Sequence, residues 1–309
     1  MLDITLEVNH IKRLVKPNLL NGVKVDVILD TDTFNEIDDQ FALAYLVKAG
    51  KLNVKAIYAA PFLNSKSTSP KDGMEKSHEE ILRVLSLMGR EDISSNVYKG
   101  SGAFLSSETE PVHSPAAEHL VKTAMEYSAE NPLYVVAIGA ITNIASALLI
   151  KPEIKDRIVL VWLGGHAHNW HDTREFNMYQ DVAAARIVFG CGIPLVQLPC
   201  MGVVSAFTIG GPELEHWLRG KNPLCDYLID VTTKEALHDG GLPTWTRVIW
   251  DVTAVAWLMG DFTLDKLVHT PIPEYSGMYS FPQAGHMMRY IYHIHRDKLV
   301  QDLFEVLAK

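Results

Sequence analysis

Cysteine is scarce in this chain, with three residues among 309: Cys191, Cys200 and Cys225. They lack the paired spacing of zinc and redox sites, and three are too few for a disulfide framework. We therefore expect small buried thiols in a reducing compartment. Basic residues are also in deficit, since 28 lysines and arginines face 37 aspartates and glutamates, a formal net charge of −9. Without a basic stripe, the chain is a poor candidate for binding nucleic acid.

Long uninterrupted hydrophobic segments are missing as well. Residues 131–150 and 187–212 carry no charge, but prolines, glycines and polar residues interrupt both. A membrane-spanning helix needs about 20 predominantly apolar residues, so buried strands and turns explain these segments better, and we expect no membrane partner. The N-terminal residues are acidic where a signal peptide is basic. A cytoplasmic protein is therefore expected.

What remains is a globular composition, 48% hydrophobic and 21% charged. Short apolar segments alternate with helix-length amphipathic ones. The predicted strands are 23–29, 54–59, 133–138, 158–163 and 194–198, and the predicted helices are 38–48, 76–87, 114–128, 143–149 and 181–189. This alternation predicts an α/β fold, a mostly parallel open sheet with helices on both faces, related to the Rossmann folds.

No linker-like tract or internal repeat divides the chain. We expect one domain over residues 23–309, preceded by an N-terminal extension over residues 1–22 that packs on the outside. Residues 64–73, rich in serine and lysine, are predicted to form a mobile surface loop.

Four aspartates cluster where the first predicted strand ends. Asp30 and Asp32 lie two apart on an extended chain and point roughly the same way, and a helix is predicted to begin near Asp38 and Asp39. Ligands of open α/β sheets bind at the carboxyl ends of strands. Helix capping accounts for one or two of these carboxylates, whereas a hard divalent cation with oxygen ligands relieves the repulsion among all four. The segment therefore predicts a metal site.

The same segment fits a second chemistry. Residues 30–33 (DTDT) approach the DxDxT motif of haloacid-dehalogenase-like phosphatases, in which Asp30 would be the nucleophile and Asp32 the acid/base. Phe34 stands where that motif has its threonine. The later strand ends do not offer the lysine and acidic pair that such a phosphatase needs.

Polar residues also follow the later strands. Residues 139–143 (GAITN) begin with a glycine that lets backbone approach a ligand, and Thr142 or Asn143 could cap the next helix. The loop after strand 158–163 offers amide and carboxylate groups suited to sugar hydroxyls, although it could also be a polar loop facing water. These groups belong to Asn169, Glu175 and Asn177.

Two other features have ordinary explanations when taken alone. His166, His168 and His171 match no standard zinc spacing and are expected to be solvated. Asp251 precedes the apolar segment 252–259, where it could cap a helix or contribute a further acid to the site.

In their order along the chain, these motifs resemble the calcium-dependent inosine–uridine nucleoside hydrolase family. The motifs are DTD followed by DD, then GAITN, then N-x5-E-F-N, then an aspartate before a helix, and the resemblance runs from about residue 23 to the C-terminus. It implies a nucleoside hydrolase-like fold and a Ca²⁺-dependent enzyme that cleaves the N-glycosidic bond of a ribonucleoside or related ribosyl compound. Because family members are usually dimers or tetramers, it also implies a homodimer or homotetramer.

The resemblance further implies roles for single residues. Asp32, Asp39, Asp251 and the carbonyl of Ile138 would hold the Ca²⁺, and Asp32 would be the base that activates the metal-bound water. Asp30 would support the water-binding aspartate. The ribose hydroxyls would be held by Asp38, Asn64, Asn169, Glu175 and Asn177.

Trp250 stands where many family members have a histidine. It could stack on a purine base or be a core aromatic. His238, Arg247 or His168 could then protonate the leaving base. The family's aspartate spacing is two residues longer here, within residues 33–37. Two alternatives stay open: the DxDxT phosphatase and a non-catalytic Ca²⁺-dependent sugar-binding protein.

Overall fold

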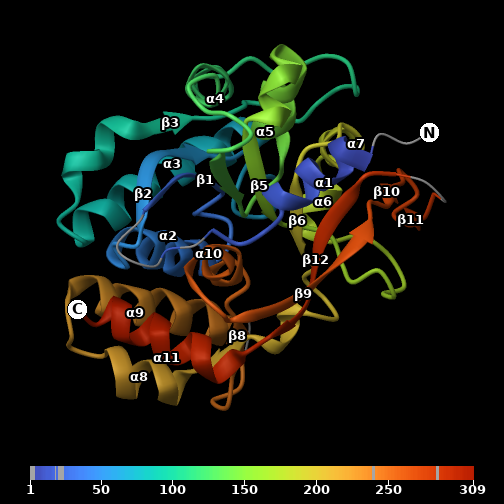
Figure 1. Cartoon of the computed structure of the whole chain (residues 1–309). Helices are drawn as coiled ribbons and strands as arrows, with labels where there is room; N and C mark the ends of the chain where they lie inside the picture. The colour runs from blue at the N-terminus through green and yellow to red at the C-terminus, as the bar shows by residue number, and fades with distance from the viewer. Residues whose placement is uncertain (1–3, 18, 20–23, 239–240, 283–284) are drawn as a thin grey trace.

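The computed structural model describes residues 4–17, 19, 24–238, 241–282 and 285–309. At its centre is an eight-stranded sheet with the order β3-β2-β1-β4-β5-β6-β12-β9 (Figure 1). All its pairings are parallel except β12 with β9. The strands are β1 (Val25–Thr31), β2 (Leu52–Ala59), β3 (Val97–Lys99), β4 (Leu133–Ala137), β5 (Ile158–Leu163), β6 (Leu195–Leu198), β9 (Thr263–His269) and β12 (Met287–Ile294).

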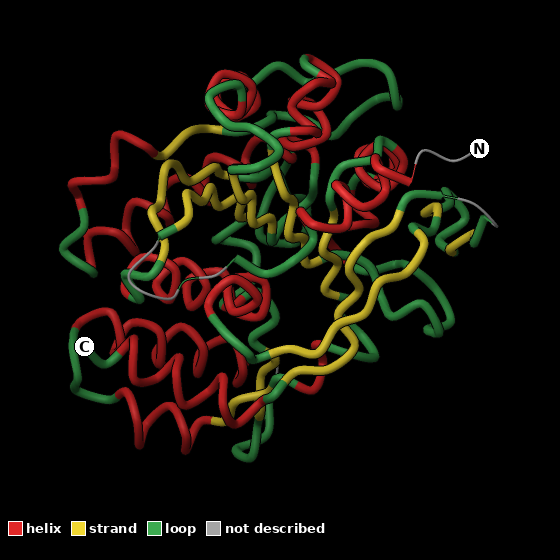
Figure 2. The backbone as a smooth tube through the Cα atoms, in the orientation of Figure 1, coloured by secondary structure: helices red, strands yellow, loops and turns green. Residues whose placement is uncertain are grey.

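Helices cover both faces of the sheet, as the red segments on either side of the yellow strands show in Figure 2. Along β1, Val27 and Leu29 belong to one hydrophobic core and Ile28 to the other, as the alternation of a strand requires. The predicted α/β fold is confirmed. The helices are α1 (Ile4–Arg13), α2 (Asp38–Lys48), α3 (Pro70–Leu87), α4 (Pro115–Ala124), α5 (Thr142–Ile150), α6 (Phe176–Gln180), α7 (Val182–Gly190), α8 (Gly211–Leu218), α9 (Pro223–Leu237), α10 (Val252–Met259) and α11 (Arg296–Leu307).

Short elements fill the connections. Two small antiparallel pairs join β7 (Thr208–Gly210) to β8 (Thr246–Val248) and β10 (Ile272–Pro273) to β11 (Tyr279–Ser280). The short 3₁₀ helices are η2 (Glu91–Asn96), η3 (Pro152–Asp156) and η4 (Val204–Ala206). Within the described ranges, no helix is long and apolar enough to cross a membrane.

Capping residues explain where the helices depart from prediction. Ser69 accepts a hydrogen bond from the N–H of Asp72, and Pro70 occupies the first turn, so α3 begins six residues before the predicted start at 76. Part of the predicted surface loop 64–73 is therefore helix. Ser114 caps α4 in the same way, but α4 ends at Ala124 rather than 128.

The N-terminal segment packs on β12. His10 Nε2 lies 2.6 Å from the carbonyl oxygen of Met287, and Arg13 donates to the carbonyl of Lys155. Residues 1–3, 18 and 20–22 of the predicted extension, and residue 23 of the first predicted strand, lie outside the described residues. The division of the chain at residue 22 stays a prediction.

The parallel sheet brings distant turns to one edge. Asp30 of β1 pairs with Ala137 of β4, and Ala137 pairs with Trp162 of β5, so the turns after these strands meet at the carboxyl edge. Helix α10 packs against α2. This packing carries Asp251 to the aspartates that follow β1.

Candidate metal centre and active site

A pocket lies at the carboxyl edge of the sheet, where the ends of β1, β4, β5 and β6 meet the starts of α2, α6 and α10. It is the site that the sequence predicts for ligand binding. The predicted site residues that line it are Asp32, Asp38, Asp39, Ile138, Glu175, Asn177, Trp250 and Asp251.

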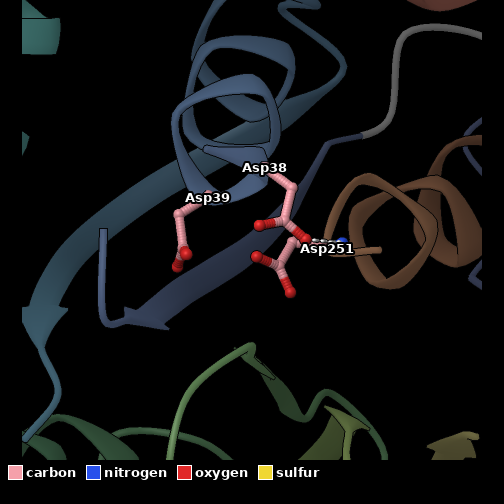
Figure 3. A group of neighbouring side chains, drawn as sticks. All are labelled: Asp38, Asp39 and Asp251. Carbon is pink, nitrogen blue, oxygen red and sulfur yellow. Dashed lines mark hydrogen bonds between the residues drawn. The ribbon is translucent and has the colours of Figure 1, made fainter. Parts of the chain in front are cut away.

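Three carboxylates converge between α2 and α10 (Figure 3). Oxygen atoms of Asp38, Asp39 and Asp251 lie within 4.8 Å of one another, a group that could hold a metal ion. Each side chain is at most 3% exposed. The N–H of Asp251 donates to Asp38 Oδ2 at 3.4 Å, and the hydroxyl of Thr31 donates to Asp39. Of the predicted Ca²⁺ ligands, Asp39 and Asp251 belong to this group, and Asp38 joins it.

Asp32 lies in the same pocket and is 1% exposed. Neither of its carboxylate oxygens has a hydrogen-bond partner among the described residues. Burial, and then the charges of Asp39 and Asp38, raise the pKa of Asp32 well above its ordinary value. A buried unpaired carboxylate is costly. The orphaned oxygens and the all-oxygen donor set fit a hard divalent cation.

The other acids of the cluster are perturbed for the same reason. Burial raises the pKa of Asp39 to about 6, partly opposed by the hydrogen bond from Thr31. Burial and then Asp38 raise the pKa of Asp251 well above its ordinary value. The cluster therefore favours protons or a cation at neutral pH.

Gly139 allows Asp32 to occupy its position. A Cβ atom at residue 139 would lie 3.2 Å from Asp32 Cγ and 3.0 Å from the Cβ of Ala60. Glycine is therefore required after β4 because a side chain there would crowd the predicted catalytic carboxylate. An unusual backbone angle is not the reason.

Asp30 lies beneath the pocket and is fully buried. Asn143 Nδ2 donates to Asp30 Oδ1 at 2.7 Å, and the Asn143 amide oxygen accepts from the N–H of Ser101. Burial raises the pKa of Asp30 to about 7. The expected capping of α5 by Thr142 or Asn143 is wrong, because no side chain caps that helix and Thr142 instead donates to Asp181. Asn143 therefore holds Asp30, the acid two residues before Asp32.

Glu175 and Asn177 bind the backbone around the pocket. Glu175 caps α6 and accepts from the N–H groups of Gly165, Asn177 and Met178. Asn177 Nδ2 donates to the carbonyl oxygens of Ile138 and Leu163, both at 3.1 Å. The amide oxygen of Asn177 remains available to accept from a ligand, and Ile138 itself lines the pocket.

Two predicted ribose-binding residues do not line the pocket. Asn169 is exposed. Asn64 is half-buried and donates to the amide oxygen of Asn35 at 2.7 Å, so that Asn35 stands at the pocket in its place. The roles predicted for Asn64 and Asn169 stay predictions.

The histidines behave differently from one another. His171 is exposed, as expected. His168 is not solvated: its Nε2 lies 3.1 Å from Gln197 Oε1, and its ring lies 4.2 Å from that of Tyr290. Gln197 donates its own amide hydrogens to Gly164 and Tyr279, so His168 is the donor of its bond to Gln197. The expectation of three solvated histidines is wrong because the rings of Tyr279, Phe281 and Tyr290 pack around His168.

Burial lowers the pKa of His168 from its ordinary 6.5 to about 4. Because the unfolded chain binds the proton more tightly, the contribution of this residue to stability is present above pH 6.5 and is lost as the pH falls toward 4. The free energy of unfolding should fall between pH 7 and pH 5, and we expect this fall to be about 2 kcal/mol smaller in His168→Asn than in the wild-type protein. Urea titrations at both pH values measure it. The exposed control His171→Asn should leave the loss unchanged, and equal losses in wild type and His168→Asn would contradict a buried neutral imidazole.

The structure adds lining residues that the sequence did not indicate. They are Asn35, Glu36, Leu163, His166, Arg174, Phe176, Cys200 and Met201. Asn35 and Glu36 belong to the lengthened segment 33–37, and Lys66 Nζ holds that segment by donating to the Asn35 carbonyl at 2.8 Å. Cys200 and Met201 follow β6, so the rule that ligands bind at strand ends could have found them. None of the three proposed proton donors, His168, His238 and Arg247, is among the described residues that line the pocket.

Solved structures share this fold. The plant nucleoside hydrolase PpNRh1 matches with a TM-score of 0.74 at 20% identity, covering 93% of this chain and 99% of that one. A purine-preferring ribonucleoside hydrolase from Gardnerella vaginalis matches with a TM-score of 0.68 at 21% identity, covering 92% and 98%. The fold is therefore that of the nucleoside hydrolases.

Sequence similarity narrows the class. The pyrimidine-specific ribonucleoside hydrolase RihA of Escherichia coli O1:K1 / APEC is 29% identical over 263 residues, 75% of this chain and 79% of the relative. The model of the inosine-uridine preferring nucleoside hydrolases matches residues 27–279. The chain belongs to this family, which confirms the resemblance and the predicted enzyme class, an N-glycosyl hydrolase. The phosphatase alternative loses its basis.

Proposed function

We propose that this protein is a Ca²⁺-dependent hydrolase that cleaves the N-glycosidic bond of a ribonucleoside or related ribosyl compound. One observation carries the proposal. Asp32, with two unpartnered buried oxygens, shares a pocket with the converging carboxylates of Asp38, Asp39 and Asp251. Family membership supports the reaction class.

The metal would be held by Asp32, Asp39, Asp251 and the carbonyl of Ile138. The donor set is all oxygen, which suits Ca²⁺. When bound, Ca²⁺ supplies positive charge that lowers the pKa of a neighbouring water molecule. Asp38, which the structure adds to the carboxylate group, would accept from a ribose hydroxyl at the same edge.

The remaining chemistry belongs to the side chains. Asp32 takes a proton from the attacking water as the C1′–N bond of the substrate breaks. Positive charge develops on the sugar, and the buried carboxylates stabilise it. Asp30, held by Asn143, supports the position of Asp32 from beneath the pocket.

Trp250 is half-buried and lines the pocket next to Asp251. We infer that its ring stacks on the leaving base. Trp250→Ala is expected to raise KM for inosine about tenfold and for uridine less, because a purine offers the larger stacking surface, with stacking worth about 0.5–1.5 kcal/mol. Steady-state kinetics on both nucleosides measures the split. Trp217→Ala, a 53% exposed tryptophan outside the pocket, is the control; equal effects on inosine and uridine would reject base stacking.

Release of reducing sugar from a panel of purine and pyrimidine ribonucleosides, with and without a Ca²⁺ chelator, tests the proposal. We expect ribose release that the chelator abolishes and added Ca²⁺ restores. Binding of nucleosides without turnover would instead support the sugar-binding alternative, and release of phosphate from phosphomonoesters would revive the phosphatase.

Two further expectations from the resemblance stay predictions. These are a homodimer or homotetramer and a cytoplasmic location. Light scattering of the purified protein measures the first, and fractionation of the source cells the second.

A further inference from the structure

Arg174 is the one lysine or arginine among the described residues that line the pocket. Its guanidinium makes no hydrogen bond or ion pair within the described part of the chain; only its backbone N–H is bonded, to Asp172. Other cations close to the site are satisfied: Lys66 pairs with Glu235 at 3.1 Å, and Arg247 donates to the Glu235 carbonyl. Arg174 is exposed, so water can reach its guanidinium, and it places a permanent positive charge in a pocket that six acids also line.

The position of Arg174 is constrained by the turn between β10 and β11. The N–H of Thr173 donates to the carbonyl of Gly277 at 2.8 Å. Gly277 has a φ of +81°, and a Cβ atom there would lie 2.8 Å from Arg174 Nε. The backbone of the preceding residue and the side chain of Arg174 therefore lie against this turn. A guanidinium that is already held in this way loses little further conformational freedom when it binds a ligand.

Trp250 and Arg174, which both line the pocket, lie on different elements. Trp250 precedes α10, beside the carboxylates, whereas Arg174 belongs to the loop between β5 and α6, directly before Glu175. In the proposed function the vicinal hydroxyls of ribose face the carboxylates and the base faces Trp250. The remaining substituent of the furanose is its C5′ group. In this placement the C5′ group faces the part of the pocket wall that Arg174 forms.

We propose that Arg174 forms an anion subsite and that the substrates include ribonucleoside 5′-monophosphates. The planar fork of an arginine matches phosphate oxygens with paired charge-assisted hydrogen bonds. This inference rests on the proposed function and deepens it. The reaction balances with water alone: the C1′–N bond breaks, a C1′–O bond forms to water, one proton passes to the nitrogen of the leaving base, and ribose 5-phosphate is released with its phosphate intact.

Kinetics on matched substrate pairs, inosine with inosine 5′-monophosphate and uridine with uridine 5′-monophosphate, tests the subsite. For the wild-type protein we expect kcat/KM on the monophosphates to equal or exceed that on the nucleosides. Arg174→Gln should lower kcat/KM about tenfold or more on the monophosphates, the worth of a charge-assisted pair of hydrogen bonds, and less than about twofold on the nucleosides. Arg90→Gln, an arginine that pairs with Asp92 away from the pocket, is the control.

Each contrary outcome has a distinct meaning. Hydrolysis of the nucleosides but not of their monophosphates overturns the subsite and leaves the proposed function standing. An equal loss on both substrates in Arg174→Gln also overturns it, because Arg174 would then act on the sugar or the base. If neither substrate is cleaved, the proposed function fails, and binding then tests the subsite. Tighter binding of ribose 5-phosphate than of ribose by the Ca²⁺-loaded protein, lost in Arg174→Gln, would still support the subsite. Equal binding of ribose 5-phosphate and ribose would overturn it.

Discussion

Replacing Asp32 by asparagine is expected to lower kcat for ribonucleoside hydrolysis by about 10²–10⁴-fold, the usual worth of a general base. The substitution keeps the size of the side chain but removes the charge that accepts a proton. It should not unfold the protein. In the metal-free state Asp32 is a buried carboxylate without a hydrogen-bond partner, and removal of its charge relieves repulsion from Asp38 and Asp39.

Reducing-sugar release measures the first effect, and thermal unfolding without added metal measures the second. Asp26→Asn is the matched control, because Asp26 lies on β1, the strand that leads to Asp32, but contacts Asn53 and Tyr127 outside the pocket. Its activity should stay within about twofold of wild type, since surface substitutions are near neutral. Retention of more than a tenth of wild-type activity in Asp32→Asn would show that Asp32 is not the base.

Removal of Ca²⁺ should abolish activity and also lower stability. We expect a chelator to reduce kcat by about 100-fold or more, because several kcal/mol of charge stabilisation are lost. A ligand present at 100 times its Kd stabilises the folded state by about 2.7 kcal/mol. For a chain of this size we therefore expect Ca²⁺ to raise Tm by about 5 °C or more.

The sign of the pH dependence follows from the buried acids. Burial raises the pKa of Asp39 from its ordinary 3.8 to about 6, so its contribution to the stability of the metal-free protein is present below pH 3.8 and is lost as the pH rises through 6. Calcium replaces the lost protons. The Ca²⁺-induced rise in Tm should therefore be larger at pH 8 than at pH 5, and a rise that is equal at both values would argue against binding at these carboxylates.

The central strands could be predicted because both of their faces are buried. Segments such as β4 and β5 are continuous hydrophobic runs, which is typical of parallel strands covered by helices. In contrast, β9 carries Asp265 and Lys266, and β12 carries Arg289 and His293. These two strands form an antiparallel edge, so their polar side chains conceal the strand pattern in the sequence.

The acids of the site could also be predicted from the sequence. Asp32, Asp38 and Asp39 are close in the sequence, and their mutual repulsion can be recognised without a structure. Arg174 and His166 could not be found in that way, because their positions depend on contacts with the turn at Gly277 and with the N–H of Met201. Loops have no periodicity from which such contacts could be inferred.

The most direct test of the central claim, that these carboxylates share one divalent cation, is a crystal structure of the protein with Ca²⁺ and ribose. We predict a single ion with oxygen ligands from Asp32, Asp39, Asp251 and the Ile138 carbonyl at roughly 2.3–2.6 Å, and ribose hydroxyls beside it. A pocket that binds ribose at millimolar Ca²⁺ without an ion among these carboxylates would contradict the claim.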